Sequence, residues 1–318
     1  MAALNPKETF RFPVKESYVE ANGLAFCVEE RGKPDGPPVV FIMGLGCQMT
    51  FWPDALLNGL AEQGYRVICF DNRDIGLSEK IPSQVRVDTR VAYLKHKIGV
   101  RFDSNYTLID MALDTAHLID QMALGSAHVV GISMGGMIAQ LLASRHPNRV
   151  RSLTVLMSST NAPNLPPPDL GLMLKLGWAG PAGHDEASAV ARWINFWQAI
   201  QSPRYPANPA EIESRVRSGY RRNYSPGGTL RQLQAILASG SIAPHSSEIL
   251  APTLVLHGRD DPLLKPRCGK AVARAIGHAD LEIITGLGHD LPEALIPEFV
   301  DLIGANCRRA ETQTADQA

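Results

Sequence analysis

The clearest candidate for chemistry in this sequence is Ser133, which stands in the segment GISMGG at positions 131–136. Gly131, Ser133 and Gly135 form the pattern G-x-S-x-G, after the apolar run AHVV and before the amphipathic run MIAQLLASRHP. Between a strand and a helix, this pattern makes a sharp turn that holds the serine clear of the sheet. The context predicts a nucleophilic serine, and a glycine-rich turn with an incidental serine is the alternative.

A serine hydroxyl is a poor nucleophile until a base accepts its proton, so one of the nine histidines should lie beside it in the fold. His289 stands in LEIITGLGHDLPEA, in a glycine-containing loop just past the last apolar run. His257 lies inside an apolar run and His128 begins another, which favours structural roles for both. We therefore predict that His289 is the base.

The base in turn needs a carboxylate that holds its tautomer and stabilises the imidazolium. The segment LVLHGRDDPLL at 254–264 offers Asp260 and Asp261 at the end of the preceding apolar run. Adjacent residues of an extended segment point to opposite sides, so both cannot face one imidazole. The order serine, aspartate, histidine along the chain is expected of one hydrolase architecture and not of the others.

Apolar β-rich runs alternate with segments of helical period, which predicts βαβ units and a mostly parallel sheet. A hairpin is expected at Asn22-Gly23. A helix is expected from Tyr106 to Leu124, with Thr107 and Asp110 at the spacing of a capped N-terminus. The predicted strands are PPVVFIMG, YRVICFD, AHVVGIS, VRSLTVLMSS, PTLVLHG and LEIITG, near-continuous apolar runs typical of a sheet covered on both faces. Ligands are expected at the C-terminal ends of these strands.

The alternation breaks between about Thr160 and His245, where prolines cluster and no strand is expected. One helix is predicted from Ala187 to Ile200. We interpret the segment as an inserted helical cap at 160–245, which divides a core domain into 1–159 and 246–318. The polar tail after Arg308 is expected to be disordered.

Composition excludes several classes of function. The chain has 318 residues, 45% of them hydrophobic, and a formal net charge of −1, so no basic field points to nucleic acid or a membrane surface. The N-terminus lacks the apolar region of a secretion signal, and no apolar run is as long as a membrane span. Five scattered cysteines without a CxxC pair argue against disulfides and zinc and fit a reducing cytoplasm.

Three segments, GLGCQMTFWP, FDNRDIGLS and GISMGGMIAQLLA, resemble the esterase branch of the α/β-hydrolase superfamily that includes aclacinomycin methylesterase. The resemblance extends from about Tyr18 to Ile303. It implies an α/β-hydrolase fold, with a mostly parallel central sheet flanked by helices and an inserted helical cap. It also implies hydrolysis of carboxylic esters by Ser133, an aspartate of HGRDDP and His289. The family pattern H-G-x-x-D, counted from His257, falls on Asp261.

Asp261 is therefore the predicted acid, and Pro262 favours the extended geometry this requires, leaving Asp260 toward solvent. The backbone N–H groups of Leu45 and Met134 are the expected oxyanion donors. The family commonly has His-Gly-x where this chain has Met43-Gly44-Leu45, which raises the question of what braces the loop. In DNRDIGLS, Asp74 replaces the usual glycine, and Asp71, Arg73 and Asp74 are expected to form an ion-pair network.

Gly44, Cys47, Trp193 and Trp197 are candidates for lining the substrate pocket. The two tryptophans are four residues apart and should share a helix face, where packing of cap against body is the alternative; Trp178 also falls in the cap. Cys47 borders the oxyanion loop, or is an inert packed thiol. The segment RVRSGYRRNY (215–224) is expected to be a solvated helix face, with attraction of an anionic substrate as the alternative.

No metal or organic cofactor is expected, because HExxH is absent and GLGCQ lacks the full GxGxxG. The expected partner is a small-molecule ester, and the sequence does not indicate an oligomeric state. Three alternatives stay open: perhydrolase or haloperoxidase chemistry with the same triad, hydrolysis of carbon–carbon bonds, and a non-catalytic binding protein that reuses the pocket.

Overall fold

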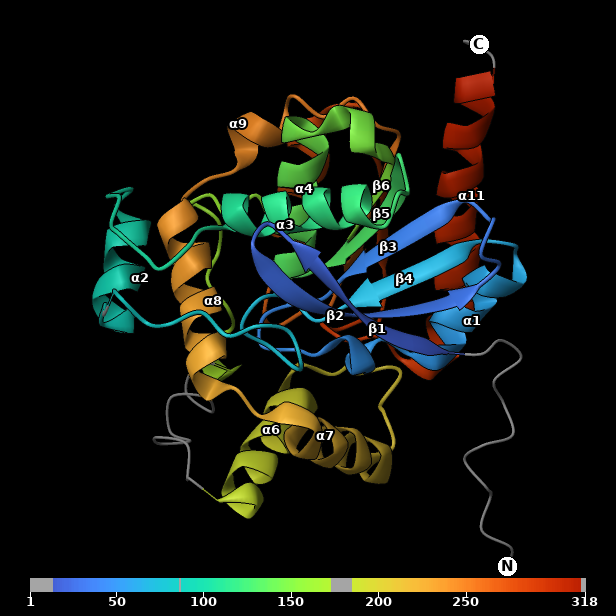
Figure 1. Ribbon diagram of the computed structural model, residues 1–318. Helices are drawn as coiled ribbons and strands as arrows, with labels where there is room; N and C mark the ends of the chain where they lie inside the picture. The colour runs from blue at the N-terminus through green and yellow to red at the C-terminus, as the bar shows by residue number, and fades with distance from the viewer. Residues whose placement is uncertain (1–13, 86, 173–184, 316–318) are drawn as a thin grey trace, which may run out of the picture.

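An eight-stranded sheet forms the centre of the computed structural model, which describes residues 14–85, 87–172 and 185–315 (Figure 1). The strands lie in the order β1-β2-β4-β3-β5-β6-β7-β8. The strands from β4 to β8 in this order are parallel, whereas β2 is antiparallel to both of its neighbours, β1 and β4. The predicted mostly parallel sheet is therefore confirmed. Their bounds are β1 (Lys15–Ala21), β2 (Leu24–Gly32), β3 (Pro38–Ile42), β4 (Arg66–Phe70), β5 (Ala127–Ile132), β6 (Val150–Leu156), β7 (Thr253–Gly258) and β8 (Asp280–Ile284).

The hairpin between β1 and β2 turns at the predicted position. Ala21 pairs with Leu24, which leaves a two-residue loop of Asn22 and Gly23. Both loop residues have positive φ angles, 50° and 75°, as the tight turns that match strand twist require. An asparagine followed by a glycine tolerates this geometry better than any other common pair, and so fixes the register of the two strands.

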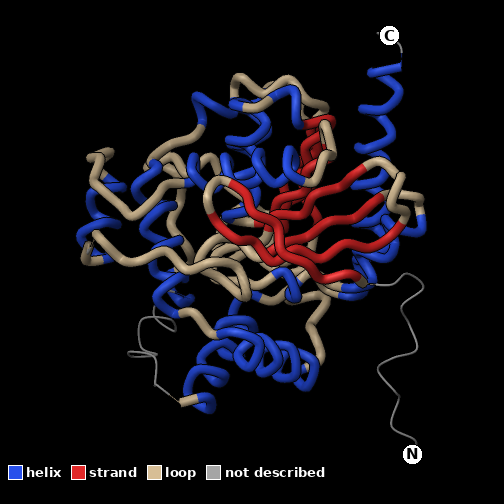
Figure 2. The backbone as a smooth tube through the Cα atoms, in the orientation of Figure 1, coloured by secondary structure: helices blue, strands red, loops and turns tan. Residues whose placement is uncertain are grey.

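Helices cover both faces of the sheet, and each face has its own hydrophobic core (Figures 1 and 2). One core contains side chains of α3 (Leu108–Gln121), α4 (Met134–Arg145) and α10 (Pro266–Ile276). The other contains side chains of α1 (Asp54–Glu62) and α11 (Ile296–Ala315). Strands β3, β5 and β7 are buried along their whole length, as their apolar sequences predict.

Two expectations about the C-terminal part are wrong. Strand β8 is an edge strand whose side chains are exposed or half-buried, because it has a neighbour only on one side. The tail after Arg308 is helical as far as Ala315, since α11 continues through it. Cys307 and Ala310 are buried, so the continued helix still has a face packed on the body.

Helix α3 begins as its sequence predicts. Thr107 and Asp110 form a capping box, in which the Asp110 carboxylate accepts from the Thr107 N–H at 2.7 Å. The short elements η1 (Met49–Phe51), η2 (Pro147–Arg149) and η3 (Glu293–Leu295) are single 3₁₀ turns in the connections. Within the described ranges, no helix is both long and apolar enough to cross a membrane.

The segment predicted to form the cap consists of helices and loops in its described parts, 160–172 and 185–245, and those parts contain no strand (Figure 2). It contributes α6 (Glu186–Ile200), α7 (Pro209–Asn223), α8 (Pro226–Ser239) and the start of α9 (Ala243–Ser246). Helices α6 and α7 pack together away from the sheet, whereas α8 lies along α2 (Thr89–Lys97) and α3 (Figure 1). Trp178 lies outside the described residues.

Two buried ion pairs fasten the cap to the loop after β4. Arg222 of α7 bonds to Asp71 at 2.6 Å, and Arg231 of α8 bonds to both oxygens of Asp74 at 2.7 and 2.9 Å. Arg73 instead pairs with Asp114 of α3. The predicted network among Asp71, Arg73 and Asp74 is therefore wrong, because each of these side chains reaches a different helix.

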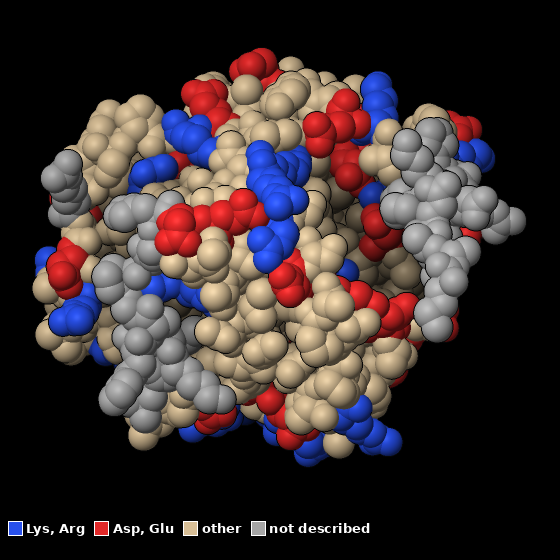
Figure 3. All heavy atoms as spheres, turned by 90° about the horizontal axis from the view of Figure 1, so that it is seen from below, with Lys and Arg blue, Asp and Glu red and all other residues tan. Residues whose placement is uncertain are grey.

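Arg222 also corrects the prediction of a solvated face at 215–224. Its side chain is only 15% exposed, and it donates to the side chain of Gln48 as well as to Asp71. On the molecular surface seen from the cap side, acidic and basic side chains are mixed (Figure 3).

Candidate active site

Ser133 lies at the turn between β5 and α4, with backbone angles φ 55° and ψ −118°. Few residues with a side chain adopt positive φ, and such strained positions gather at functional sites. The turn is held on both sides, since the Ser133 N–H donates to the Leu156 carbonyl at 2.9 Å and its own carbonyl accepts from the Ser158 hydroxyl at 2.6 Å. The serine predicted from G-x-S-x-G therefore occupies the sharp turn expected of a nucleophile.

The glycines around Ser133 let the start of α4 approach the sheet closely. A Cβ on Gly135 would lie 2.0 Å from the carbonyl oxygen of Ile42, and a Cβ on Gly131 would lie 2.3 Å from that of Gly135. Neither contact is possible for a side chain. The G-x-S-x-G spacing thus reflects the contact between β3, β5 and the first turn of α4.

The loop after β3 lies directly against the serine. A Cβ on Gly44 would be 3.3 Å from the Ser133 Cβ, so the next residue, Leu45, is also beside it. Among the hydrogen bonds of the described residues, none uses the Leu45 N–H. Met134 is the first residue of α4, where a backbone N–H has no partner within the helix. Both predicted oxyanion donors thus have N–H groups to offer.

Asn72 braces this loop in place of the missing histidine. Its side chain, which is buried, donates to the Met43 carbonyl at 2.9 Å. Gln232 of α8 supports the other end of the loop, because its side chain accepts from the Gly46 N–H and donates to the Arg73 carbonyl, each at 2.9 Å. The loop is therefore tied to the β4 connection and to the cap.

His289 and Asp261 form a direct hydrogen bond, with 2.7 Å between Nδ1 and Oδ2. Asp261 is buried, and its other oxygen accepts from the N–H groups of Leu263 and Leu264, both at 2.8 Å. Asp260 is exposed and accepts instead from the Gly286 N–H. Of the two adjacent aspartates, the fold brings only Asp261 to the imidazole.

A second imidazole lies on the far side of Asp261. His257 Nε2 is 3.5 Å from Asp261 Oδ2 and 2.7 Å from the Leu264 carbonyl, to which it can donate. The ring is fully buried, and burial lowers the pKa of His257. The interpretation of His257 as a core residue holds, although its Nδ1 has no hydrogen-bond partner among the described residues.

Ile200 and Ser202, which the sequence did not single out, hold the loop that contains His289 against the cap. Ser202, just after α6, donates from its N–H to Asp290 Oδ1 at 3.0 Å and accepts from the Gly288 N–H at 2.9 Å. The His289 N–H itself donates to the Ile200 carbonyl at 2.8 Å. The only signal for this contact was the acidic residue next to His289 in GHDLP.

Ser133 and His289 open into one cavity of about 970 Å³. Its lining includes Leu45 and Met134 and three of the four predicted pocket residues, namely Gly44, Cys47 and Trp197. Burial raises the pKa of the Cys47 thiol to about 12, in agreement with an inert packed thiol. Trp197 stacks on Phe51, with ring centres 5.4 Å apart.

Trp193 does not line this cavity, so its predicted role in the pocket is corrected. Its ring lies edge-on to Phe196 and packs beside Gly46, on the side where α6 meets α7. Four residues turn a helix by about 400° and advance it by about 6 Å, so Trp193 and Trp197 can face different hollows.

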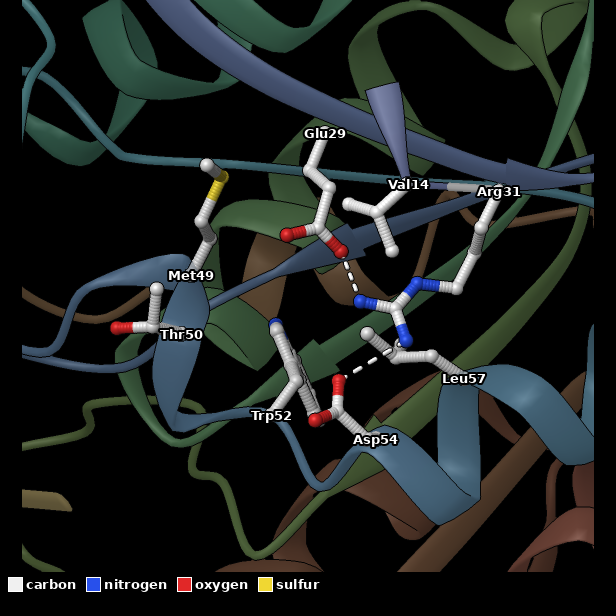
Figure 4. A pocket seen from close by; sticks show the side chains of 8 residues that line it. All are labelled: Val14, Glu29, Arg31, Met49, Thr50, Trp52, Asp54 and Leu57. Carbon is white, nitrogen blue, oxygen red and sulfur yellow. Dashed lines mark hydrogen bonds and ion pairs between the residues drawn. The ribbon is translucent and has the colours of Figure 1, made fainter. Parts of the chain in front are cut away.

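A smaller hollow of about 340 Å³ is lined by residues of β2, η1 and α1 (Figure 4). Its charged side chains are matched, since Arg31 pairs with Glu29 and bonds to Asp54 at 2.9 Å (Figure 4). It lacks a serine or histidine among its described lining residues. The large cavity is therefore the candidate active site.

The family model for the alpha/beta hydrolase fold matches residues 37–293. The chain belongs to this family. The match covers β3 to η3 and includes Ser133, Asp261 and His289. It agrees with the expected fold, in which an α/β-hydrolase carries its reactive groups on loops at the C-terminal ends of strands.

Among relatives of this α/β-hydrolase, a rhodomycin D methylesterase of Streptomyces sp. (strain C5) is 27% identical over 302 residues, or 88% of this chain and 93% of the relative. A 2-hydroxymuconate semialdehyde hydrolase of Pseudomonas sp. (strain CF600) is 27% identical over 279 residues, which cover 85% of this chain and 86% of the relative. The solved structure of a 2-hydroxy-6-oxo-6-phenylhexa-2,4-dienoate hydrolase of Rhodococcus sp. (strain RHA1) superposes with a TM-score of 0.70 at 18% identity. The superposition covers 95% of this chain and 99% of the solved chain. The resemblance to a methylesterase branch is thus confirmed, and the family is one of hydrolases.

Proposed function

We propose that this α/β-hydrolase is a serine esterase that hydrolyses carboxylic esters through an acyl-enzyme intermediate. One observation carries the proposal: the strained Ser133 and the Asp261-bonded imidazole of His289 open into the same cavity. Ser133 is the proposed nucleophile, His289 the general base and Asp261 the carboxylate that orients the base.

The hydrogen bond to Asp261 decides which nitrogen of His289 can act. A carboxylate oxygen 2.7 Å from Nδ1 holds the proton on that nitrogen, which leaves Nε2 free to accept. Nε2 then takes the proton of Ser133 Oγ as the oxygen attacks the ester carbon, and the neighbouring carboxylate stabilises the imidazolium that forms.

The negative charge of the tetrahedral intermediate falls on the former carbonyl oxygen. In this proposal the N–H groups of Leu45 and Met134 donate to that oxygen, and the positive end of α4 adds to the stabilisation. The imidazolium gives its proton to the departing alkoxide. Water, deprotonated by His289, then attacks the acyl-enzyme and releases the acid.

The charges of the cavity favour esters over the anionic substrates of carbon–carbon hydrolases, whose names as muconate or dienoate hydrolases imply a carboxylate. Lys97, one of the cations in the described lining, already donates to the carbonyls of Pro163 and Leu165. Arg215 lies exposed at the rim. Asp290, which is buried in the wall, would repel an anion.

The volume of the cavity favours a substrate of substantial size. Ligand pockets of about 300–1,000 Å³ enclose most of a drug-sized molecule, and this one lies near the upper end at about 970 Å³. Phe196, Trp197 and Leu237 are among its apolar lining residues. We therefore favour esters with a bulky apolar part.

A panel of p-nitrophenyl esters, combined with fluorophosphonate labelling, tests the proposal. Ser133→Ala is expected to lower turnover on the order of 10⁵–10⁶-fold and to abolish labelling. Ser144→Ala, on the same helix but bonded only to the Leu141 carbonyl, is the matched control and should keep both. Absence of hydrolysis and of labelling in the wild type would refute the proposal and favour a binding protein. Added hydrogen peroxide with a halogenation indicator distinguishes perhydrolysis from hydrolysis.

A further inference from the structure

The residue after the proposed base, Asp290, is a carboxylate in the wall of the cavity. It is only 9% exposed, and burial raises the pKa of its carboxyl. Other acidic residues of the described lining, such as Glu211 and Glu293, lie exposed toward the rim. Asp290 is therefore the buried carboxylate that a bound substrate meets.

The two oxygens of Asp290 differ in their partners. Oδ1 accepts from the N–H and the hydroxyl of Ser202, a residue with no exposed surface. The Ser202 hydroxyl in turn accepts from the Gly288 N–H at 2.9 Å. These bonds fix the orientation of the carboxylate. Oδ2 has no hydrogen-bond partner among the described residues. It is not one of their fully buried unpartnered atoms either, so it keeps some exposed surface, and Asp290 is a lining residue of the cavity.

A largely desolvated carboxylate oxygen is costly unless a donor reaches it. The nearby cations do not supply one, because Lys97 is bonded to backbone carbonyls and Arg215 stands at the rim. His289 directs Nδ1 to Asp261, and its other nitrogen is assigned to Ser133. A hydrogen-bond donor to Oδ2 therefore has to come from the molecule that occupies the cavity.

We propose that Asp290 is a specificity residue whose Oδ2 accepts a hydrogen bond from a hydroxyl or protonated amine of the substrate. The inference rests on the proposed esterase function and names the substrate class for that site. Because Asp290 adjoins His289, the donor group would lie within a few atoms of the scissile ester. A 3-hydroxy or 3-amino ester has this arrangement.

Four ethyl esters of similar size test the proposal: butyrate, 3-hydroxybutyrate, 3-aminobutyrate and the anionic monoethyl succinate. The wild type is expected to prefer the hydroxy and amino esters over butyrate by about 10- to 100-fold in kcat/KM, the value of a hydrogen bond to a charged acceptor. Monoethyl succinate should be the poorest substrate, since its carboxylate would approach that of Asp290.

Asp290→Asn keeps the size of the side chain. Its carbonyl can still accept from Ser202, which directs the amide NH₂ into the cavity. The preference for donor-bearing esters should fall to about one, and monoethyl succinate should improve relative to butyrate. The preference is a ratio of rates on one preparation, so it does not depend on the fraction of folded protein.

Ser202→Ala is the matched control, because it removes a bond to the other oxygen and loosens the same loop. It should lower kcat for all four esters by a similar factor and leave the preference in place. A wild type without preference, or an Asp290→Asn variant that slows all four esters equally, would overturn the inference while leaving the esterase proposal intact. Failure of that proposal gives a different result, namely no ester hydrolysed and no labelling of Ser133.

Discussion

Replacing Asp261 by asparagine should disable the base through its tautomer rather than through its position. In the wild type, Oδ1 of Asp261 accepts from the N–H groups of Leu263 and Leu264, both at 2.8 Å. An asparagine satisfies these two donors only if its carbonyl oxygen takes the same place. Its NH₂ then faces His289 Nδ1, which must give up its proton and accept. The remaining proton moves to Nε2, where it blocks proton transfer from Ser133.

The expected loss is large because the acting nitrogen is already protonated in the dominant tautomer. A wrong tautomer in a serine triad lowers kcat by about 10⁴-fold, or about 5.5 kcal/mol in the activation barrier. Binding should change little, because Asp261 is buried behind His289 and does not line the cavity. The loss is therefore expected in kcat, with KM within a small factor of its original value.

Asp260→Asn is the matched control, one residue away and identical in chemistry. Asp260 is exposed, and an asparagine oxygen can still accept from the Gly286 N–H. Steady-state kinetics with a p-nitrophenyl ester, normalised by the concentration of folded protein, compare the two variants. A fall for Asp260→Asn, or kcat for Asp261→Asn within about tenfold of the wild type, would refute the tautomer argument and reassign the acid.

Two further predictions concern stability. Asp74→Ala leaves Arg231 without its buried partner and should lower the free energy of unfolding by about 3 kcal/mol. Asp74→Gly should lower it by about 1 kcal/mol less, because residue 74 has a φ of 74°, which glycine adopts without strain. Urea unfolding that gives the two variants equal losses would contradict this prediction. Burial lowers the pKa of His128 to about 4. Below about pH 6.5, His128 therefore binds a proton in the unfolded chain but not in the folded chain. The free energy of unfolding falls toward pH 4 by at most ~1.4 kcal/mol per pH unit. His128→Gln should flatten that part of the curve, and parallel curves for both proteins would exclude His128 as the cause.

The parts of the site that the sequence predicted depend on local backbone rules. Gly131 and Gly135 were informative because strand-to-helix contact excludes a Cβ at both positions. His289 and Asp261 could be placed because parallel strands end at one edge of a sheet, so loops distant in sequence meet there. Neither inference required knowledge of how the cap folds.

Features that the sequence did not reveal depend on contacts across long separations. Arg222 and Asp71 are 151 positions apart, and nothing in a basic run indicates that one of its members is buried against a carboxylate. Ser202 and Asp290 are 88 positions apart and meet only because the chain leaving α6 passes beside the His289 loop. Helical spacing also placed Trp193 and Trp197 on one face, although only the actual packing of α6 decides which hollow each one meets.

The contacts of the cap imply a cavity whose shape is set before the substrate arrives. Arg222 and Arg231 tie α7 and α8 to the loop after β4, and the segment after α6 is bonded to both sides of His289. A movement of α6 away from the sheet would therefore break bonds that hold the proposed base, in addition to opening the cavity. In the proposed mechanism, opening therefore disturbs the base through Ile200 and Ser202, and the proposed discrimination between esters rests on the fixed lining that includes Asp290.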